Sequence, residues 1–382
     1  MATQYSNSTL TITSVGAPDP FVNQTRGRFY LTFTTGNRIE IWSSRSLVDI
    51  EKAGSRHVVW KPPLGTDHSA DLWAPELHAI RDRWYIYYAA AHPVHGNKSH
   101  RMYVLGGPPA SADPCQGQWE FLGRISGMPE QLAIDGTVFE LHGQPYLGYS
   151  GWPLDNQGDS DLIQQLFIVG MEDPTSAGYG PMMICQPEEK WEFTRDANGG
   201  HGINEGPQFL ASPDGEWKGL VYSCAGSWTR EYKMATLQFM RGNPLDASSW
   251  RKGAKPLIET KPGAAGPFGP GHGSFLQLRG EVVIVYHATD QPTDGWDNRR
   301  ARVQRVAFTG QGPYMSKSPD AAGKKGGLGE RFKAKVKTEL GMKKIQDDQG
   351  EESLKALLDG QKMDDDGVNG TNGANTRFSW GS

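Results

Sequence analysis

This chain of 382 residues has few cysteines, no long apolar stretch and no excess of positive charge. Its three cysteines, Cys115, Cys185 and Cys224, lie far apart and form no C-x-x-C pair. That spacing excludes a disulfide framework and a zinc site built on cysteine. The longest apolar runs, such as Val282–Tyr286, have the length of a strand. They fall far short of the roughly 20 residues that cross a bilayer, so no membrane partner is expected.

The charge balance and the first residues bear on partners and location. The chain has 39 basic and 43 acidic residues and a formal net charge of -4. Proteins that neutralise phosphates carry a strongly positive surface, so nucleic acid is not an expected partner. The N-terminal residues contain neither the charged nor the apolar region of a signal peptide. On sequence alone, the protein is therefore expected to be intracellular.

Glycine and proline, by contrast, are abundant. The chain contains 48 glycines and 25 prolines, which together make up about 19 % of its residues. The average combined share in proteins is about 12 %. A bundle of long helices cannot accommodate so many helix-breaking residues. Short strands joined by turns can accommodate them, so an all-β fold is predicted.

The aromatic content collapses near residue 316. Only three aromatic residues follow that point, Phe332, Phe378 and Trp380, in a segment rich in both lysine and aspartate. Such a segment buries too little apolar surface to offset its chain entropy. The sequence therefore predicts a folded domain over residues 1–316 and a disordered tail over 317–382, with fraying helices allowed around Glu330–Lys344.

Five segments of the first domain share one layout. Each opens with a small residue or proline, a polar residue and a short apolar stretch, followed by a turn and an aromatic-rich strand. Their predicted bounds are 17–62, 70–126, 133–188, 203–260 and 270–310. Each interval fits one four-stranded antiparallel sheet, and such sheets close radially. The prediction is a five-bladed β-propeller whose first strands line the axis and whose loops form a funnel.

The polar residue of each opening is a candidate for chemistry. The five residues are Asp19, Glu76, Asp135, Glu205 and His272. Carboxylates gathered around one axis raise one another's pKa, which a fold does not need for stability. The arrangement favours acid–base catalysis, with one acid kept protonated and one base kept ionised. The alternative is a ring that binds a metal ion or ordered water.

Tryptophans accompany these openings. Trp42, Trp73, Trp152, Trp228 and Trp296 are expected in or beside the loops at the mouth. Individually each is more typical of a core, because large aromatic side chains are usually buried. Together they favour a cleft for sugars, since indole faces stack on the apolar faces of sugar rings.

The motifs resemble those of glycoside hydrolase family 43. They are Ala17-Pro18-Asp19-Pro20-Phe21, Trp73-Ala74-Pro75-Glu76, Ala133-Ile134-Asp135-Gly136, Asn204-Glu205-Gly206-Pro207, Gly271-His272-Gly273 and Tyr286-His287-Ala288. The resemblance covers roughly residues 12–312. It implies a five-bladed propeller that hydrolyses arabinose- or xylose-containing polysaccharides with inversion and needs no cofactor.

The resemblance also implies roles for individual residues. Asp19 is expected to be the general base, Glu205 the general acid, and Asp135 the group that orients the acid and tunes its pKa. Glu76 has no catalytic role in the family and is interpreted as structural. His272 matches an axial histidine beside a calcium ion or water. The expected substrate-binding residues are Trp73, Trp152, His272, Arg299 and Arg300, where either arginine could reach a sugar hydroxyl and a solvated loop is the alternative.

The expected activity is that of an α-L-arabinofuranosidase acting on arabinan or arabinose-substituted polysaccharides. A β-xylosidase and an endo-arabinanase of the same family remain alternatives, because a few loop residues decide between the sugars. A propeller that binds sugars without catalysis, or proteins through its tail, is a further alternative. The protein is expected to be a monomer. Members of the family are mostly secreted, which departs from the intracellular expectation above.

Overall fold

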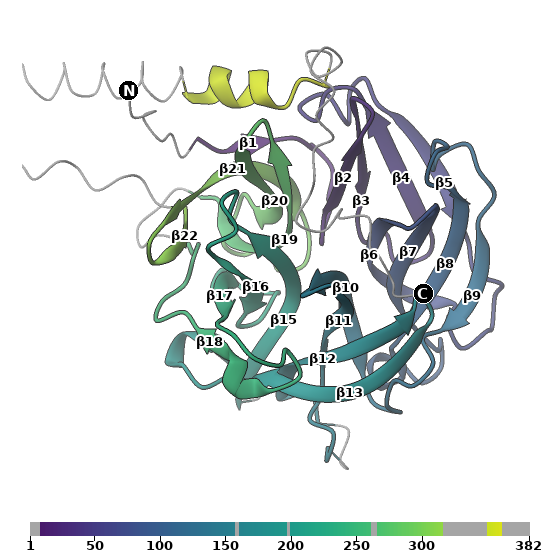
Figure 1. Ribbon diagram of the computed structural model, residues 1–382, viewed down its shortest axis with the longest axis vertical. Coiled ribbons are helices and arrows are strands. Elements are labelled where there is room, and N and C mark those ends of the chain that lie inside the picture. The colour runs from purple at the N-terminus through teal and green to yellow at the C-terminus, as the bar shows by residue number, and fades with distance from the viewer. Residues whose placement is uncertain (1–7, 157–159, 197–198, 261–265, 316–349, 361–382) are drawn as a thin grey trace, which may run out of the picture.

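The structure is a computed structural model that describes residues 8–156, 160–196, 199–260, 266–315 and 350–360. Figure 1 shows five groups of strands arranged around one axis. Within each group the strands follow one another outwards, and the innermost strands contact those of the neighbouring groups. The predicted all-β, five-bladed propeller is therefore confirmed.

The blades begin where the repeats predicted them. The first blade consists of β2 (Phe21–Thr25), β3 (Arg28–Thr32), β4 (Ile39–Ser44) and β5 (Ser55–Trp60). The second consists of β6 (Ala70–Ile80), β7 (Arg83–Ala91), β8 (Arg101–Pro109) and β9 (Glu120–Arg124). The third consists of β10 (Ala133–Leu141), β11 (Gln144–Gly151), β12 (Ile163–Asp173) and β13 (Ser176–Cys185). The fourth consists of β15 (Gly199–Ala211), β16 (Lys218–Cys224), β17 (Lys233–Phe239) and β18 (Trp250–Lys252).

The fifth blade closes the ring in a way that the repeats did not predict. It consists of β19 (Phe268–Leu278), β20 (Glu281–Thr289), β21 (Arg300–Thr309) and the N-terminal β1 (Leu10–Thr11). The predicted fifth segment, 270–310, supplies only three of these strands. Because β1 is two residues long and precedes the first repeat, no alternating pattern marks it. Strands from both ends of the propeller thus share one sheet.

Smaller elements link and cap the blades. Residues Ile163 and Gln164 of β12 pair in parallel with Gly202 and Ile203 of β15, which joins the third and fourth blades into one sheet. Up to residue 315, the described part of the chain also contains β14 (Phe193–Asp196), β22 (Gly312–Tyr314) and the short 3₁₀-helices η1 (Asn97–Ser99), η2 (Lys190–Glu192) and η3 (Ala247–Ser249). In the described residues, no helix is both long and apolar enough to span a membrane.

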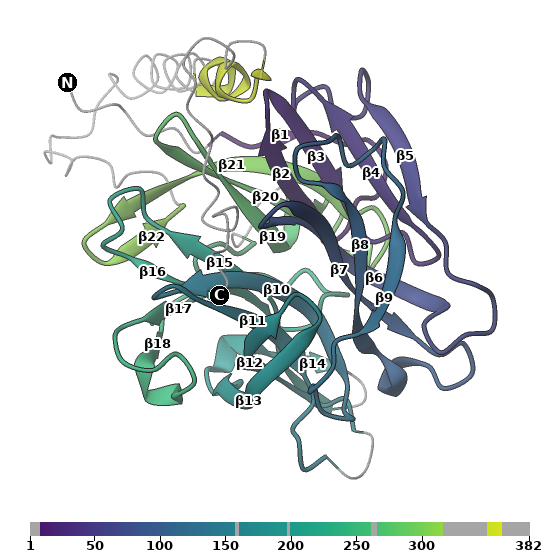
Figure 2. The ribbon, with the colours of Figure 1, turned by 45° about the vertical axis from the view of Figure 1, so that its right-hand side comes forward.

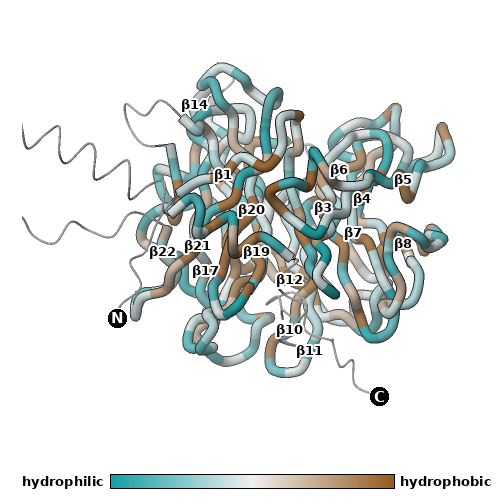
Figure 3. Tube along the Cα trace, turned by 90° about the horizontal axis from the view of Figure 1, so that it is seen from above, coloured by the Kyte–Doolittle hydropathy of each residue, from teal (hydrophilic) through white to brown (hydrophobic). Residues whose placement is uncertain are grey.

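Five apolar clusters lie between neighbouring blades, one for each junction. Successive strand residues point to opposite faces of a sheet, so a single strand serves two clusters. Val138 packs against the second blade and Phe139 against the fourth, for example. Figure 3 shows hydrophobic stretches along the inner strands, such as β19. This two-sided burial accounts for runs such as Val282–Tyr286 being apolar throughout.

A short helix over residues 350–357 packs beside β1, at the junction of the first and fifth blades (Figures 1 and 2). Leu354 and Leu357 of this helix, and Leu358 directly after it, are at most 5 % exposed and belong to that junction's apolar cluster. Asp359 forms a β-bridge with Ser46 of the first blade.

The predicted disorder of residues 317–382 is therefore corrected for 350–360. Three leucines spaced for one helix face supply the buried surface that the low aromatic content seemed to exclude. The rest of the tail, including Glu330–Lys344, lies outside the described residues.

Candidate active site

Each blade carries one residue with a left-handed backbone near the same end of the axis. These residues are Asp19 (φ 55°), Ala74 (φ 44°), Asp135 (φ 57°), Gly206 (φ 55°) and His272 (φ 35°). In the second to fifth blades, the pairing of the two inner strands shifts register around this point. Such bulges re-aim side chains, and positive φ is uncommon for residues other than glycine. The five left-handed residues mark the end of the axis at which the predicted side chains meet.

This register corrects the equivalence inferred from the repeats. The second blade holds Ala74 at this position rather than Glu76, and the fourth holds Gly206, one residue after Glu205. The acidic residues suggested another alignment because a bulge leaves no signal in the residue pattern. Glu76 lies two residues further along β6 and is 2 % exposed. Gln208 of the fourth blade donates a hydrogen bond to its carboxylate, so Glu76 ties two blades together.

Asp19 is surrounded by donors and positive charge. Thr34 Oγ1 donates a hydrogen bond to its Oδ2 at 2.7 Å, and His272 Nδ1 lies 3.3 Å from its Oδ1. Arg299 Nη1 lies 3.8 Å from the same oxygen. Burial alone would raise the pKa of Asp19, but His272 and then Arg299 hold it well below its usual range. The Asp19 carboxyl is therefore ionised throughout the neutral range.

Asp135 lies next to this pair. Its Oδ2 accepts a hydrogen bond from the Gly206 backbone N–H at 3.0 Å and lies 3.9 Å from His272 Nδ1. Burial raises the pKa of Asp135, His272 opposes that effect, and Asp19 adds to it, giving about 6. For His272 the balance is reversed: burial lowers the pKa, but Asp135 and Asp19 raise it to about 9. The imidazole is therefore a cation between two carboxyl groups.

Of the three acids, Glu205 has the highest pKa. Tyr232 Oη donates a hydrogen bond to its Oε1 at 2.7 Å, and Gln164 Nε2 lies 3.4 Å from its Oε2. Burial raises the pKa of Glu205, the negative charge of Asp135 raises it further, and the Tyr232 hydrogen bond lowers it, giving about 7. Glu205 therefore keeps its proton at a pH where Asp19 has lost its own.

Three contacts in this cluster were not predicted. Thr34 and Tyr232 hydrogen-bond Asp19 and Glu205, yet neither belongs to a recognisable motif, so the sequence offered no signal for them. His287 belongs to the motif Tyr286-His287-Ala288, but the motif predicts no role for it. Its Nδ1 accepts a hydrogen bond from the Asp19 backbone N–H at 3.1 Å. Burial and then Arg299 lower the pKa of His287 well below its usual value, so its ring is neutral.

The two candidate arginines point to different partners. Arg299 faces Asp19, and its Nε donates a hydrogen bond to the Trp296 carbonyl at 3.0 Å. Arg300 Nη1 lies 2.5 Å from Asp290 Oδ2 and is about one-third exposed. Arg299 is therefore the arginine that the fold brings to the acids, and sugar binding by either stays a prediction.

The predicted tryptophans differ in exposure. Trp152 is 2 % exposed and packs in the cluster between the second and third blades, and Trp42 is buried under the Arg56 guanidinium. Trp73 is partly buried, with its ring stacked on His100 at 3.9 Å. Substrate contact by Trp73 and Trp152 stays a prediction, and Trp152 offers no open face here. Trp296, in contrast, is 61 % exposed.

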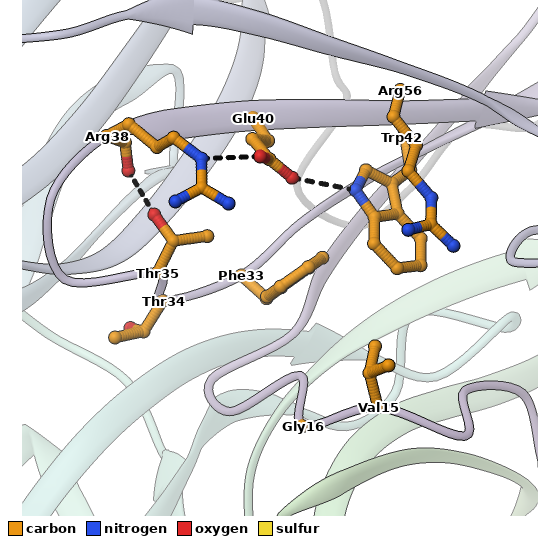
Figure 4. A pocket seen from close by; sticks show the side chains of 9 residues that line it. All are labelled: Val15, Gly16, Phe33, Thr34, Thr35, Arg38, Glu40, Trp42 and Arg56. Atoms are coloured by element: carbon orange, nitrogen blue, oxygen red, sulfur yellow. Dashed lines mark hydrogen bonds and ion pairs between the residues drawn. The ribbon is translucent and has the colours of Figure 1, made fainter.

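A cleft of about 410 Å³ opens in the first blade next to Asp19. Thr34, the Asp19 partner, is part of its wall (Figure 4). Arg38 Nε donates to Glu40, which in turn accepts a hydrogen bond from Trp42 Nε1 at 3.0 Å. The three acids do not line this cleft, so it adjoins the acid cluster only through Thr34.

The expected calcium ion beside His272 finds little support in the donor set. Calcium takes six to eight oxygen ligands, whereas the His272 Nδ1 atom faces two carboxyl groups and carries a proton. Across the residues that the structure describes, no group of three or more His, Cys, Asp or Glu side chains is arranged to hold a metal ion. An axial calcium ion or water beside His272 stays a prediction.

Several known proteins are similar to this chain. An extracellular exo-α-(1→5)-L-arabinofuranosidase of Streptomyces avermitilis is 30 % identical over 77 % of this chain and 60 % of its own length. That of Streptomyces chartreusis is 30 % identical over 71 % of this chain and 79 % of its own length. The chain thus spans less than two thirds of the first of these relatives.

Solved structures and a family model agree with these relatives. The crystal structure of an α-L-arabinofuranosidase from Lactobacillus brevis superposes with a TM-score of 0.69. It is 27 % identical and covers 81 % of this chain and 97 % of its own. The model of glycosyl hydrolases family 43 matches residues 9–313, from the strand that closes the ring to the last strand of the propeller. This chain therefore belongs to glycosyl hydrolases family 43.

Proposed function

We propose that the protein is an inverting, exo-acting α-L-arabinofuranosidase that releases L-arabinose from arabinan or from arabinose-substituted polysaccharides. The observation that carries the proposal is the contrast between two buried carboxyl groups of one cluster. Positive neighbours keep Asp19 ionised. Burial and the charge of Asp135 raise the pKa of Glu205 to about 7, so Glu205 keeps its proton up to about that pH. Such a contrast assigns a base and an acid.

The chemistry follows from these two protonation states. Asp19 removes a proton from a water molecule, whose oxygen attacks the anomeric carbon from the face opposite the leaving group. Glu205 gives its proton to the departing glycosidic oxygen. Asp135 contributes its negative charge, which holds that proton on Glu205 until the bond breaks. One displacement inverts the anomeric carbon, and neither a covalent intermediate nor a cofactor is needed.

The sugar is inferred from the relatives rather than from the acids. Two curated relatives are exo-α-(1→5)-L-arabinofuranosidases, and two fungal relatives at 28 % identity are α-L-arabinofuranosidases. The acids would act equally on a β-xyloside, because both sugars present similar hydroxyl geometry. Since the names of two relatives include the word extracellular, we also propose action outside the cell on polymeric substrate.

Two measurements test this function. Hydrolysis of p-nitrophenyl α-L-arabinofuranoside and p-nitrophenyl β-D-xylopyranoside is compared at equal enzyme concentration, with Asp19→Asn as the inactive control. The arabinofuranoside is expected to react more than about tenfold faster, a typical margin for sugar discrimination. Digestion of linear 1,5-arabinan should release arabinose alone from the start. A faster xyloside would favour the β-xylosidase, early oligosaccharides would favour the endo-arabinanase, and no reaction would favour a binding protein.

The oligomeric state is part of the proposal. Each blade is covered by two neighbours of the same chain, so both faces of every sheet are already occupied. We therefore propose a monomer. Light scattering behind size exclusion should give the mass of one chain, and a multiple of it would contradict this part of the proposal.

A further inference from the structure

An aromatic cluster lies at the rim of the site, outside the acid residues. It consists of His201 on β15, Trp228 in the loop after β16, and Trp296 in the loop before β21. His201 and Trp228 meet edge to face at a ring separation of 5.5 Å, and Trp228 and Trp296 at 5.7 Å. The outermost ring, Trp296, is 61 % exposed. Trp228 and Trp296 together thus present an aromatic surface next to the site, and Trp is a residue enriched at binding interfaces.

The two indoles are held in place although they are not buried. Trp296 Nε1 donates a hydrogen bond to Ser227 Oγ at 3.1 Å, which links the loops of the fourth and fifth blades. Trp228 lies against Gly226, where a Cβ atom would come within 2.8 Å of the ring. The Gly226 N–H is itself fixed by Thr194 Oγ1 at 2.6 Å. Rings held in this way lose little entropy when a ligand binds.

The loops that carry the two tryptophans of the cluster also contact the acid residues. The Trp296 carbonyl accepts a hydrogen bond from Arg299, whose guanidinium faces Asp19. The loop that carries Trp228 also carries Tyr232, which donates to Glu205 at 2.7 Å. The cluster thus shares a loop with the partner of the proposed general acid.

We propose that this rim aromatic cluster binds the sugar of the leaving group. The inference rests on the proposed function and adds where the second sugar unit lies. A general acid must reach the glycosidic oxygen, so the departing sugar lies on the Glu205 side of the broken bond. That sugar meets the loop of Trp228 and the exposed ring of Trp296, whose faces suit the C–H bonds of an arabinofuranose unit. The occupant is therefore the second unit of an arabino-oligosaccharide.

The test compares a leaving group that reaches the cluster with one that does not. The kcat/KM values of wild type and Trp296→Ala are measured on 1,5-α-L-arabinotriose and on methyl α-L-arabinofuranoside. The variant should lose about tenfold on the triose, the size of one aromatic contact, and less than about twofold on the methyl glycoside. Trp296→Phe, which keeps an aromatic face, should recover most of the loss.

Two further variants separate this role from a structural one. Tyr179→Ala removes another aromatic ring, which lies on β13 and is 70 % exposed. This variant should leave kcat/KM unchanged on both substrates. Gly226→Ala displaces the Trp228 ring and should reproduce the selective loss on the triose. Equal losses on both substrates, or no loss on either, would overturn the inference while the hydrolysis itself stands. A wild-type protein inactive on both arabinosides would overturn the proposed function, and the inference with it.

Discussion

The Glu205 carboxyl has two close neighbours that act on its proton in opposite directions. Burial raises the pKa of Glu205, the negative charge of Asp135 raises it further, and the hydrogen bond from Tyr232 lowers it. The resulting value, about 7, sets the pH above which the proposed acid has lost its proton. Changing either neighbour should therefore move the basic limb of the pH–rate profile, and the two changes should move it in opposite senses.

Replacement of Asp135 by asparagine removes the charge that disfavours ionised Glu205. The pKa of Glu205 then falls below 7, so kcat/KM on the p-nitrophenyl arabinofuranoside should decline at lower pH than in wild type. The profile is measured from pH 4 to pH 9. A basic limb that stays in place or moves upwards would contradict the role of Asp135.

Replacement of Tyr232 by phenylalanine removes a hydrogen bond that favours ionised Glu205. The basic limb should therefore move to higher pH, opposite to the shift in Asp135→Asn. Tyr222→Phe serves as the matched control, because that buried tyrosine donates to Glu192 instead. Equal profiles for the two phenylalanine variants would show that the Tyr232 contact does not tune the acid.

The general acid itself is tested through the leaving group. Without Glu205, substrates with poor leaving groups lose protonation that they need, whereas nitrophenolate departs without it. Glu205→Ala should lower kcat/KM by roughly 10²–10⁴-fold on arabinobiose and by much less on the p-nitrophenyl glycoside. Asp19→Ala should abolish turnover of both. A uniform loss in Glu205→Ala would assign the proton transfer to another residue.

At this scale the sequence predicted which acids meet but not how each is supported. Asp19, Asp135, Glu205 and His272 were placed at one end of the axis, where the structure has them. The choice between Arg299 and Arg300 needed the fold, because Arg299 ends the loop before β21 and Arg300 begins that strand, and the sequence does not indicate which side chain faces Asp19. Tyr232 and Thr34 were missed because each reaches its acid from a loop or strand end with no motif.

Among the elements, the strands were predictable and the bulges were not. Short apolar stretches, aromatic-rich segments and turn residues marked the two inner strands of all five blades. A bulge inserts one residue without changing composition. The sequence therefore suggested Glu76 and Glu205 for the left-handed positions that Ala74 and Gly206 occupy. The two-residue β1, Leu10–Thr11, was too short to show any periodicity.

The bulge at Gly206 can be tested with a matched pair of glycines. Gly206 has φ 55°, and a Cβ there would lie 2.9 Å from His272 Cγ, whereas Gly215 has φ 75° and open space around it. Each alanine variant should lose about 1–2 kcal/mol in unfolding free energy, the cost of a left-handed alanine. Only Gly206→Ala should also lose activity, by at least about tenfold, because it displaces His272. Full activity in Gly206→Ala would mean that the imidazole position is not critical.

Across the whole molecule, the ring is fastened at one junction by both ends of the described chain. There β1 joins the fifth blade, and residues 350–360 lie against the first and fifth blades. The Leu47 N–H donates to the Leu358 carbonyl at 3.1 Å, and the Gly360 N–H donates to the Arg45 carbonyl at 2.7 Å. This segment closes the seam that a radial fold leaves between its first and last blades.

Truncation tests this fastening. A chain that ends at residue 315 loses three buried leucines, each worth about 1.5–3 kcal/mol as an upper bound. Its Tm should fall by at least about 5 °C relative to the full chain. A chain that ends at residue 360 keeps the leucines and should melt like the full chain. Equal Tm values for all three would mean that residues 350–360 do not stabilise the propeller.

The stereochemistry of the first product shows whether the bond breaks in a single displacement between Asp19 and Glu205 or in two successive displacements. Proton NMR follows the anomeric signals while the enzyme hydrolyses an α-L-arabinofuranoside, before the released sugar mutarotates. A single displacement predicts that β-L-arabinofuranose appears first, because water attacks from the face opposite the leaving group. Initial release of the α-anomer would mean a covalent intermediate, and Asp19 could then no longer be the base.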